Sequence, residues 1–186
     1  MKDATFVCDV EALSLNYGFY INSEMGFRWK ERRVMIVDIG YEHITVFCTQ
    51  YSDNNFKVLH TATSLSYGGR LIDRILTELV ESIILKEGIT KEFIDNNPKL
   101  KAEIRTLVEQ NKTVFSNELG DVMQFQLLVS DTDISVTITH HEFVQQCQKY
   151  KFLQTIRSMC IACLDEVDGV DEVILEGSCS RLCVVS

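Results

Sequence analysis

The hydrophobic pattern changes its period at Gly68 and Gly69, and this change restricts the folds open to the chain. Before the two glycines, three short runs of apolar and β-branched residues predict three strands in a meander. After them, apolar residues recur every three or four positions from residue 71 to residue 84, which predicts a helix of about four turns. Gly88 is expected to end that helix. The three expected strands are residues 34–39, 44–49 and 56–63.

The rest of the chain predicts further helices around two more strand regions. A second helix is expected from Pro98 to about Ser116, because proline is favoured in the first turn of a helix. Thr139 and Glu142 form a T-x-x-E capping box, which predicts the start of a long helix. The other expected elements are a strand at 5–8, a helix from Asp9 to Gly18, a linker at 21–32, and strands at 125–129, 134–138 and 172–175. This order of elements predicts an α/β fold with a mixed sheet.

Composition narrows the class of protein and the kinds of partner. The 186 residues are 46% hydrophobic and 24% charged, which excludes a disordered chain. The formal net charge of −9 argues against nucleic acid and against an anionic membrane surface as partners. Seven cysteines without a secretion signal indicate a reducing compartment, so the cytoplasm is expected. The Cys160-x-x-Cys163 pair is expected to be buried thiols, and His140 and His141 are expected to hold no metal.

Several short motifs occur in an order that is specific as a set. They are residues 15–20, Val37-Asp38-Ile39-Gly40, residues 61–73 around Gly68-Gly69, Glu109-x-x-Lys112-x-x-x-Ser116, and residues 173–182. Together they resemble the second lobe of the nucleotide-binding domain in the seventy-kilodalton heat-shock chaperone family. The larger, one-hundred-and-ten-kilodalton branch of that family is the most similar, and the resemblance runs from about Phe6 to the end of the chain.

The resemblance implies a fold and a domain organisation. The implied fold is an actin-like ATPase lobe of the ribonuclease-H-like type, with a mixed sheet and an inserted helical and β subdomain at about 70–140. Residues 1–33 would be the end of the first lobe, a crossing helix and a linker, and residues 34–186 the second lobe. The first lobe is expected to be missing, and the apolar end at residues 183–186 suggests a piece cut from a longer protein.

The resemblance also implies a ligand, ATP or ADP with its Mg²⁺, and a set of site residues. Asp38 and Gly40 would lie near phosphate, since glycine turns expose backbone N–H groups and a carboxylate can hold Mg²⁺ through water. Five residues would contact adenosine: Glu109, Lys112, Ser116, Gly177 and Arg181. If residues 98–116 form one helix, Glu109, Lys112 and Ser116 share a face of it. Arg181 could stack its flat guanidinium on adenine.

The chain departs from the family's ATPases in the turn after Gly40. Tyr41, Glu42, His43 and Thr45 stand where those ATPases carry two glycines, a threonine and an aspartate. Glu42 would place a negative charge toward the phosphates. The catalytic lysine of the first lobe is also expected to be absent, so the chain alone is not expected to hydrolyse ATP.

Two functions remain open at this point. In the first, the chain forms one wall of an ATP or ADP cleft in a protein-folding or nucleotide-exchange chaperone. In the second, it is a non-catalytic interaction module whose helical region at 70–120 docks a partner chaperone or exchange factor. In either case unfolded clients would be bound through domains absent from this chain. An independent enzyme is disfavoured, because no residue pattern is left to orient an attacking water.

Overall fold

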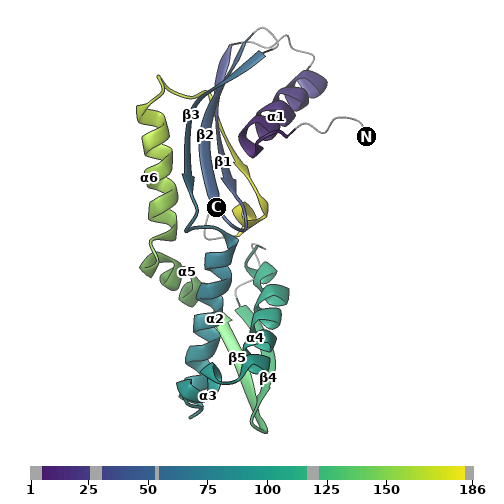
Figure 1. The fold of residues 1–186 in the computed structure, drawn as a ribbon, viewed down its shortest axis with the longest axis vertical. Helices are drawn as coiled ribbons and strands as arrows, with labels where there is room; N and C mark the ends of the chain where they lie inside the picture. Colours follow the sequence, from purple (N-terminus) through teal and green to yellow (C-terminus); the bar gives the residue numbers. More distant parts are fainter. Residues whose placement is uncertain (1–5, 26–30, 53–54, 117–121, 183–186) are drawn as a thin grey trace.

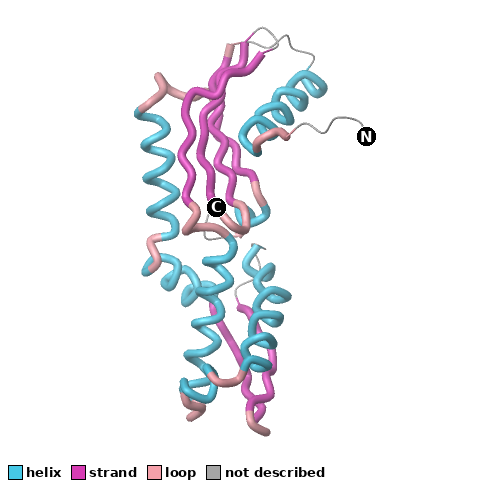
Figure 2. The backbone as a smooth tube through the Cα atoms, viewed as in Figure 1, coloured by secondary structure: helices cyan, strands magenta, loops and turns pink. Residues whose placement is uncertain are grey.

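The computed structural model describes residues 6–25, 31–52, 55–116 and 122–182, and Figure 1 shows them as two tiers along one long axis. The upper tier is a sheet with a helix on each face. The lower tier contains α2 (Gly69–Lys86), α3 (Lys91–Asp95), α4 (Pro98–Asn111) and a two-stranded hairpin. Figure 2 shows how the chain passes from the strands of the upper tier into α2 and so connects the tiers.

The upper sheet has four strands in the order β3-β2-β1-β6. Strands β1 (Arg32–Ile39), β2 (Ile44–Ser52) and β3 (Asn55–Ser64) pair antiparallel, as the expected meander does. Strand β6 (Glu172–Glu176) lies parallel to β1, with Val37 opposite Leu175. The sheet is therefore mixed, and the α/β prediction is confirmed. β1 reads as a continuous apolar run because helices cover both faces of the sheet.

Helix α1 (Asp9–Met25) corrects the sequence-based prediction in two ways. Residues 6–8 form no strand, and the helix continues through Gly18 into the expected linker. Contacts with the sheet explain this: the Tyr17 hydroxyl donates to Glu172 Oε2 at 2.5 Å, and the Ser14 and Thr49 hydroxyl oxygens lie 3.0 Å apart. Such packing outweighs the low helix propensity of one glycine.

The lower tier follows the predicted periodicity, with two local differences. Helix α2 ends where expected, because Gly88 follows it with φ +86°. The short helix α3 was not predicted; it is capped by Thr90, whose hydroxyl accepts from the Phe93 N–H. The expected helix at 98–116 ends at Asn111 and continues as the 3-10 helix η1 (Lys112–Ser116). Strands β4 (Val122–Val129) and β5 (Thr132–Thr139) form the expected hairpin.

The long helix expected after Thr139 is two helices, so that prediction is wrong. They are α5 (His140–Lys149) and α6 (Phe152–Asp165), and Lys151 between them has φ +56°. The break is stabilised by tertiary contacts on both sides: the Tyr150 hydroxyl donates to Glu78 of α2 at 2.5 Å, and Phe152 is buried. The capping box itself is confirmed, since Thr139 and Glu142 bond each other's backbone N–H.

We expect Thr139→Ala to destabilise the protein by about 1 kcal/mol, because it leaves an N–H in the first turn of α5 without its acceptor. Thr137→Ala is the matched control, since Thr137 is exposed on the same strand and caps nothing. Urea unfolding of both variants measures the difference. Equal losses would show that the capping box contributes nothing.

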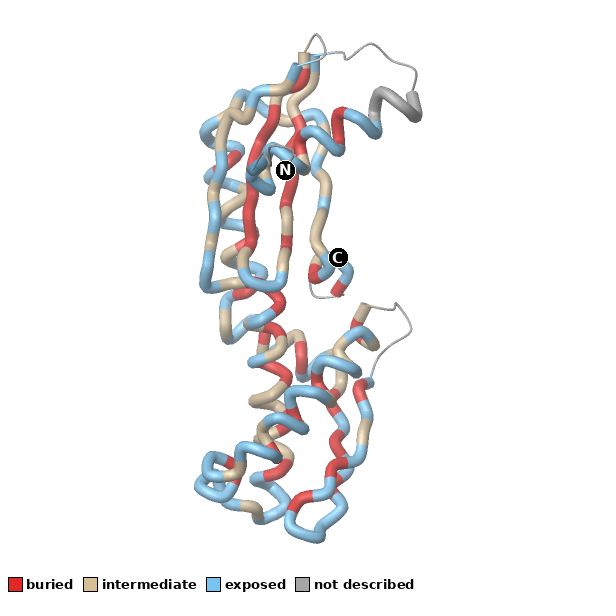
Figure 3. Tube along the Cα trace, turned by 45° about the vertical axis from the view of Figure 1, so that its right-hand side comes forward, coloured by how far each residue is buried: buried red, intermediate tan, exposed pale blue. Residues whose placement is uncertain are grey.

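One hydrophobic core connects the two tiers. Figure 3 shows buried positions along the strands of the sheet and along α2 and the hairpin. Cys163 is buried within this core and Cys160 packs against it, and burial raises the pKa of both thiols, as expected of structural cysteines. Among the described residues, no helix has the length and apolar character needed to cross a membrane.

Candidate functional site

Four segments meet where the two tiers join, and we call this place the junction. They are the β1–β2 turn (Gly40–His43), the first turn of α2, the 3-10 helix η1, and the segment from Gly177 through the 3-10 helix η2 (Ser178–Arg181). The Gly69 N–H donates to the Gly40 carbonyl at 2.9 Å, and the Arg70 N–H donates to the Tyr41 carbonyl at 2.8 Å. These bonds fix α2 against the turn.

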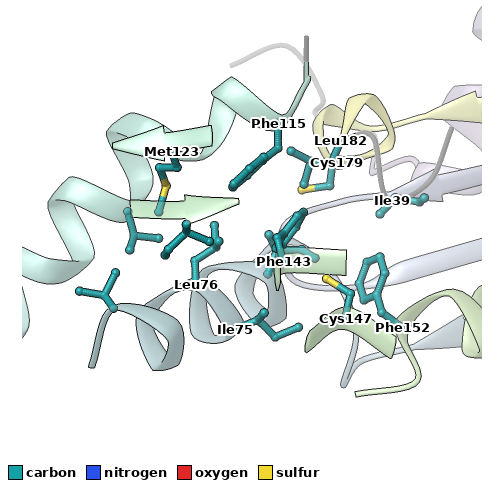
Figure 4. Close-up of a cluster of buried hydrophobic side chains, with 14 of the residues drawn as sticks. Ile39, Ile75, Leu76, Phe115, Met123, Phe143, Cys147, Phe152, Cys179 and Leu182 are labelled. Carbon is teal, nitrogen blue, oxygen red and sulfur yellow. The ribbon is translucent and has the colours of Figure 1, made fainter. Parts of the chain in front are cut away.

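Gly177 brings η2 against the end of β1. Its φ of +83° favours glycine, and a β-carbon there would overlap the Ile39 carbonyl oxygen and lie 2.7 Å from Asp38 Oδ1. On the other side of the junction, a β-carbon on Gly69 would lie 2.5 Å from Cys179 Sγ. Figure 4 shows Phe115 of η1 beside Cys179 and Leu182, so η1 and the η2 segment pack into the same part of the hydrophobic core.

Asp38 and Gly40, the two residues expected near phosphate, both lie at the junction. Burial raises the pKa of the half-buried Asp38 carboxyl; His43 opposes this shift, while Asp9 and Glu176 add to it. The Gly40 N–H donates to the His43 carbonyl at 3.0 Å and so closes the turn. The Gly40 N–H is therefore already hydrogen-bonded within the protein and does not point at a ligand.

Lys112 and Glu109 lie on the α4 side of the junction. Lys112 Nζ is 2.7 Å from Asp73 Oδ1 of α2 and 5.5 Å from the centroid of the Tyr41 ring. Glu109 is exposed and lines, together with Tyr41 and Asp73, a groove of about 610 Å³ between α2 and α4. The structure therefore places Lys112 and Glu109 within one side chain's reach of the β1–β2 turn.

Ser116 does not share the helix face that an unbroken helix would give it. From Lys112 onward the chain is a 3-10 helix, which turns by about 120° per residue rather than about 100°, so over four residues Ser116 is displaced by about 80° around the axis. Ser116 then lies about 60° from Glu109 and about 120° from Lys112 around the axis, so the three residues span a wider arc than an unbroken helix would give them. It remains in η1, half-buried, next to Phe115.

Arg181 is exposed and is the last residue of η2. The loop that carries it is held by the Ser180 hydroxyl, which donates to the Gly177 carbonyl at 2.7 Å. Burial of Leu182 anchors the next residue in the core. The guanidinium thus projects from a fixed base into solvent.

Three residues at the junction were not assigned to the site from the sequence. Tyr41, Asp73 and the ion-paired Arg70 all contact residues of the turn or of η1. The available signals were an aromatic residue directly after a strand–glycine turn and an acidic residue at the fifth position of a helix. Neither signal indicates that the Tyr41 and Asp73 side chains both lie next to the Lys112 ammonium.

Comparison with known proteins decides the family. The sequence model described as "Hsp70 protein" matches residues 4–186, almost the whole chain. The chain belongs to the Hsp70 family. The sequence resemblance is therefore confirmed, and Hsp70 membership implies the actin-like ATPase fold, of which the mixed α/β sheet is part.

Curated relatives of this Hsp70 chain lie in the large branch of the family, as the resemblance indicated. A heat shock protein homolog of Eremothecium gossypii is 30% identical over 73% of the chain and 19% of the relative. Heat shock protein hsp88 of Neurospora crassa is 28% identical over 77% and 20%, and human Heat shock 70 kDa protein 4 is 27% identical over 75% and 16%. The chain therefore spans about a fifth of the length of these relatives.

Hsp70 proteins bind ATP and ADP with Mg²⁺, so the fit of that ion to the junction matters. Among the described residues, no three or more His, Cys, Asp or Glu side chains gather as a metal site. Asp38 is half-buried, and Glu42 is paired with Arg70. The residues present do not fit a Mg²⁺ site of their own, and the ion's ligands would have to come from a nucleotide.

Proposed function

We propose that this Hsp70-family chain forms one wall of an adenine-nucleotide cleft, as the second lobe of a chaperone nucleotide-binding domain. Residues 34–186 would be that lobe, with the lower tier at about 70–140 as its inserted subdomain, and residues 1–33 would be the crossing helix and linker. The observation that carries the proposal is the junction, where the turn after β1, the start of α2, η1 and η2 converge.

The junction offers groups suited to a nucleoside. Glu109 and the Ser116 hydroxyl are acceptors for ribose hydroxyl groups, and the Lys112 stem presents methylene groups to a base. The exposed Arg181 guanidinium can stack on a purine ring. Gly177 has no side chain, so a ligand can approach the backbone at the start of η2. In this proposal the nucleotide acts as a conformational ligand rather than as a substrate.

The turn offers little for catalysis. Tyr41, Glu42 and His43 leave no glycine beyond Gly40 to cradle phosphate, and Thr45 lies within β2, where its hydroxyl oxygen is 3.2 Å from that of Thr63. The opposite wall of the cleft, partner chaperones and unfolded clients would be supplied by protein outside this chain. We expect no ATP hydrolysis by the chain alone, and phosphate release in a single-turnover assay would contradict this.

A second candidate is docking of a partner chaperone or exchange factor at the lower tier. The groove between α2 and α4 supports it, because charged side chains of both signs line its walls. They include Arg70, Arg74, Arg105, Glu78, Glu81 and Glu109. Under this alternative, Arg181 has no part in any binding event, and that difference separates the two candidates.

We expect the isolated chain to bind ADP weakly, with a dissociation constant at or above roughly 100 μM, because one wall supplies half of the contacts. Arg181→Ala should weaken binding by about 0.5–2 kcal/mol, or roughly 2–30-fold, through the lost stacking. Arg157→Ala is the matched control, since Arg157 is exposed on α6, away from the junction. Calorimetry or NMR titration measures both; equal affinities for the two variants, or a sub-micromolar constant for the wild type, would contradict the proposal.

A further inference from the structure

The Tyr41 ring lies over the two positive features of the junction. A β-carbon on Gly69, at the start of α2, would lie 2.9 Å from Tyr41 Cδ2, so the ring rests on the positive end of that helix. The Lys112 ammonium lies 5.5 Å from the ring centroid on the η1 side. Tyr41 therefore fills the space between helix terminus and lysine, which are the groups that would attract a phosphate chain.

The two positive side chains beside Tyr41 and the turn, Lys112 and Arg70, are already paired within the chain. Lys112 is bonded to Asp73, and only 19% of the Lys112 side chain and 20% of the Asp73 side chain are exposed. Arg70, in the first turn of α2, forms an ion pair with Glu42 of the turn. A phosphate would have to break both pairs and would then face the two released carboxylates.

Three backbone donors at the junction are also used. The Gly40, Gly69 and Arg70 N–H groups donate to carbonyls of the same turn, at 3.0, 2.9 and 2.8 Å. These three are among the N–H groups that a glycine turn and a helix start could otherwise direct at an anion. In contrast, the groups suited to ribose and base, Glu109 and Arg181, are exposed.

We propose that Tyr41 and Glu42 make the junction selective for adenosine, a nucleoside without a polyphosphate, over ADP and ATP. This inference rests on the proposed function and assigns it a ligand class. Tyr41 excludes the phosphates sterically, and Glu42 does so by holding Arg70 and by its own charge. The junction contacts only the base and the ribose of the ligand, so Mg²⁺ does not change the affinity of adenosine.

The test compares adenosine, ADP and ATP, with and without Mg²⁺, in NMR titrations of the 186-residue chain. Adenosine should bind at least about tenfold more tightly than ADP or ATP, and Mg²⁺ should not change this order. The double variant Tyr41→Gly/Glu42→Gly should raise ADP affinity at least about tenfold and leave adenosine affinity within about threefold. The double variant Ser130→Gly/Asp131→Gly is the control, because it adds two glycines in the remote β4–β5 turn, where both residues already have positive φ.

The outcomes separate the inference from the proposed function. Wild-type binding of ADP as tight as that of adenosine would overturn the selectivity and leave the adenine cleft standing. A folded glycine variant with no gain in ADP affinity would overturn the roles of Tyr41 and Glu42. Absence of binding by adenosine and ADP alike at millimolar concentration would overturn both. Tyr41→Phe, which removes only the hydroxyl near Asp73, keeps the ring and should retain the selectivity.

Discussion

Gly177→Ala should lower the free energy of unfolding by about 3 kcal/mol, because it combines a strained backbone with a steric overlap. At φ +83° and ψ 151° the residue lies in a region that side chains other than hydrogen rarely adopt. The added β-carbon would also overlap the Ile39 carbonyl oxygen and lie 2.6 Å from the carbonyl carbon. Both atoms belong to the backbone of β1, so the conflict is relieved only if β6 separates from β1 at this end.

Gly169→Ala is the control for a positive φ without a steric overlap. Gly169 has φ +78°, close to that of Gly177, but a β-carbon there would have no neighbour within 4 Å. Its replacement should therefore cost only about 1 kcal/mol. Urea unfolding of both variants measures the two losses. If they are equal, the close approach of Gly177 to β1 does not exist in solution.

Phe115→Ala should destabilise the protein by about 3–5 kcal/mol through the cavity that it leaves. Phe115 is 0% exposed, and its ring stacks on that of Phe143 with centroids 4.8 Å apart and planes 13° apart. Figure 4 shows it among Met123 of the hairpin, Phe143 of α5 and Cys179 of η2. Phe115 is the residue that packs η1 into the core, so its loss should also make the positions of Lys112 and Ser116 in η1 less well fixed.

Phe93→Ala is the matched control for this change. Phe93 is 38% exposed on the short helix α3, so its loss opens no closed cavity and should cost about 1 kcal/mol or less. Equilibrium unfolding in urea, followed by circular dichroism, compares the two variants. Similar losses would mean that the core does not close around Phe115.

The strands and the main helix of the lower tier could be predicted because burial determines their pattern. The continuous runs of β1 and β2 reflect a sheet covered on both faces. The alternation of β4 and β5 and the stripe of α2 reflect one covered face. The missed features depend on tertiary contacts instead. Gly18 stays helical because α1 is bonded to the sheet. The chain breaks at Lys151, where tertiary contacts hold Tyr150 against Glu78 and bury Phe152.

The motifs allowed each site residue to be named from the sequence, but they could not predict which of these residues lie next to one another in the fold. Asp38, Gly40 and Gly177 meet because β6 pairs in parallel with β1, a contact between strands far apart in the sequence. The Lys112–Asp73 pair joins residues 39 positions apart. The angular position of Ser116 differs from that in an unbroken helix because the change from α-helix to 3-10 helix has no clear residue signal. Only the packed structure shows Tyr41 over Lys112.

Amide chemical-shift mapping with adenosine tests the central claim, that the junction is an adenine-binding wall, most directly. The amide signals of Glu109, Ser116 and Gly177 should move together and saturate on one isotherm, because one ligand would touch η1 and η2 at once. The signals of Gly88 and Gly169, which lie in open positions away from the junction, should stay in place. If the three junction signals do not move at millimolar adenosine, the account is wrong, and docking of a protein partner at the α2–α4 groove becomes the better explanation.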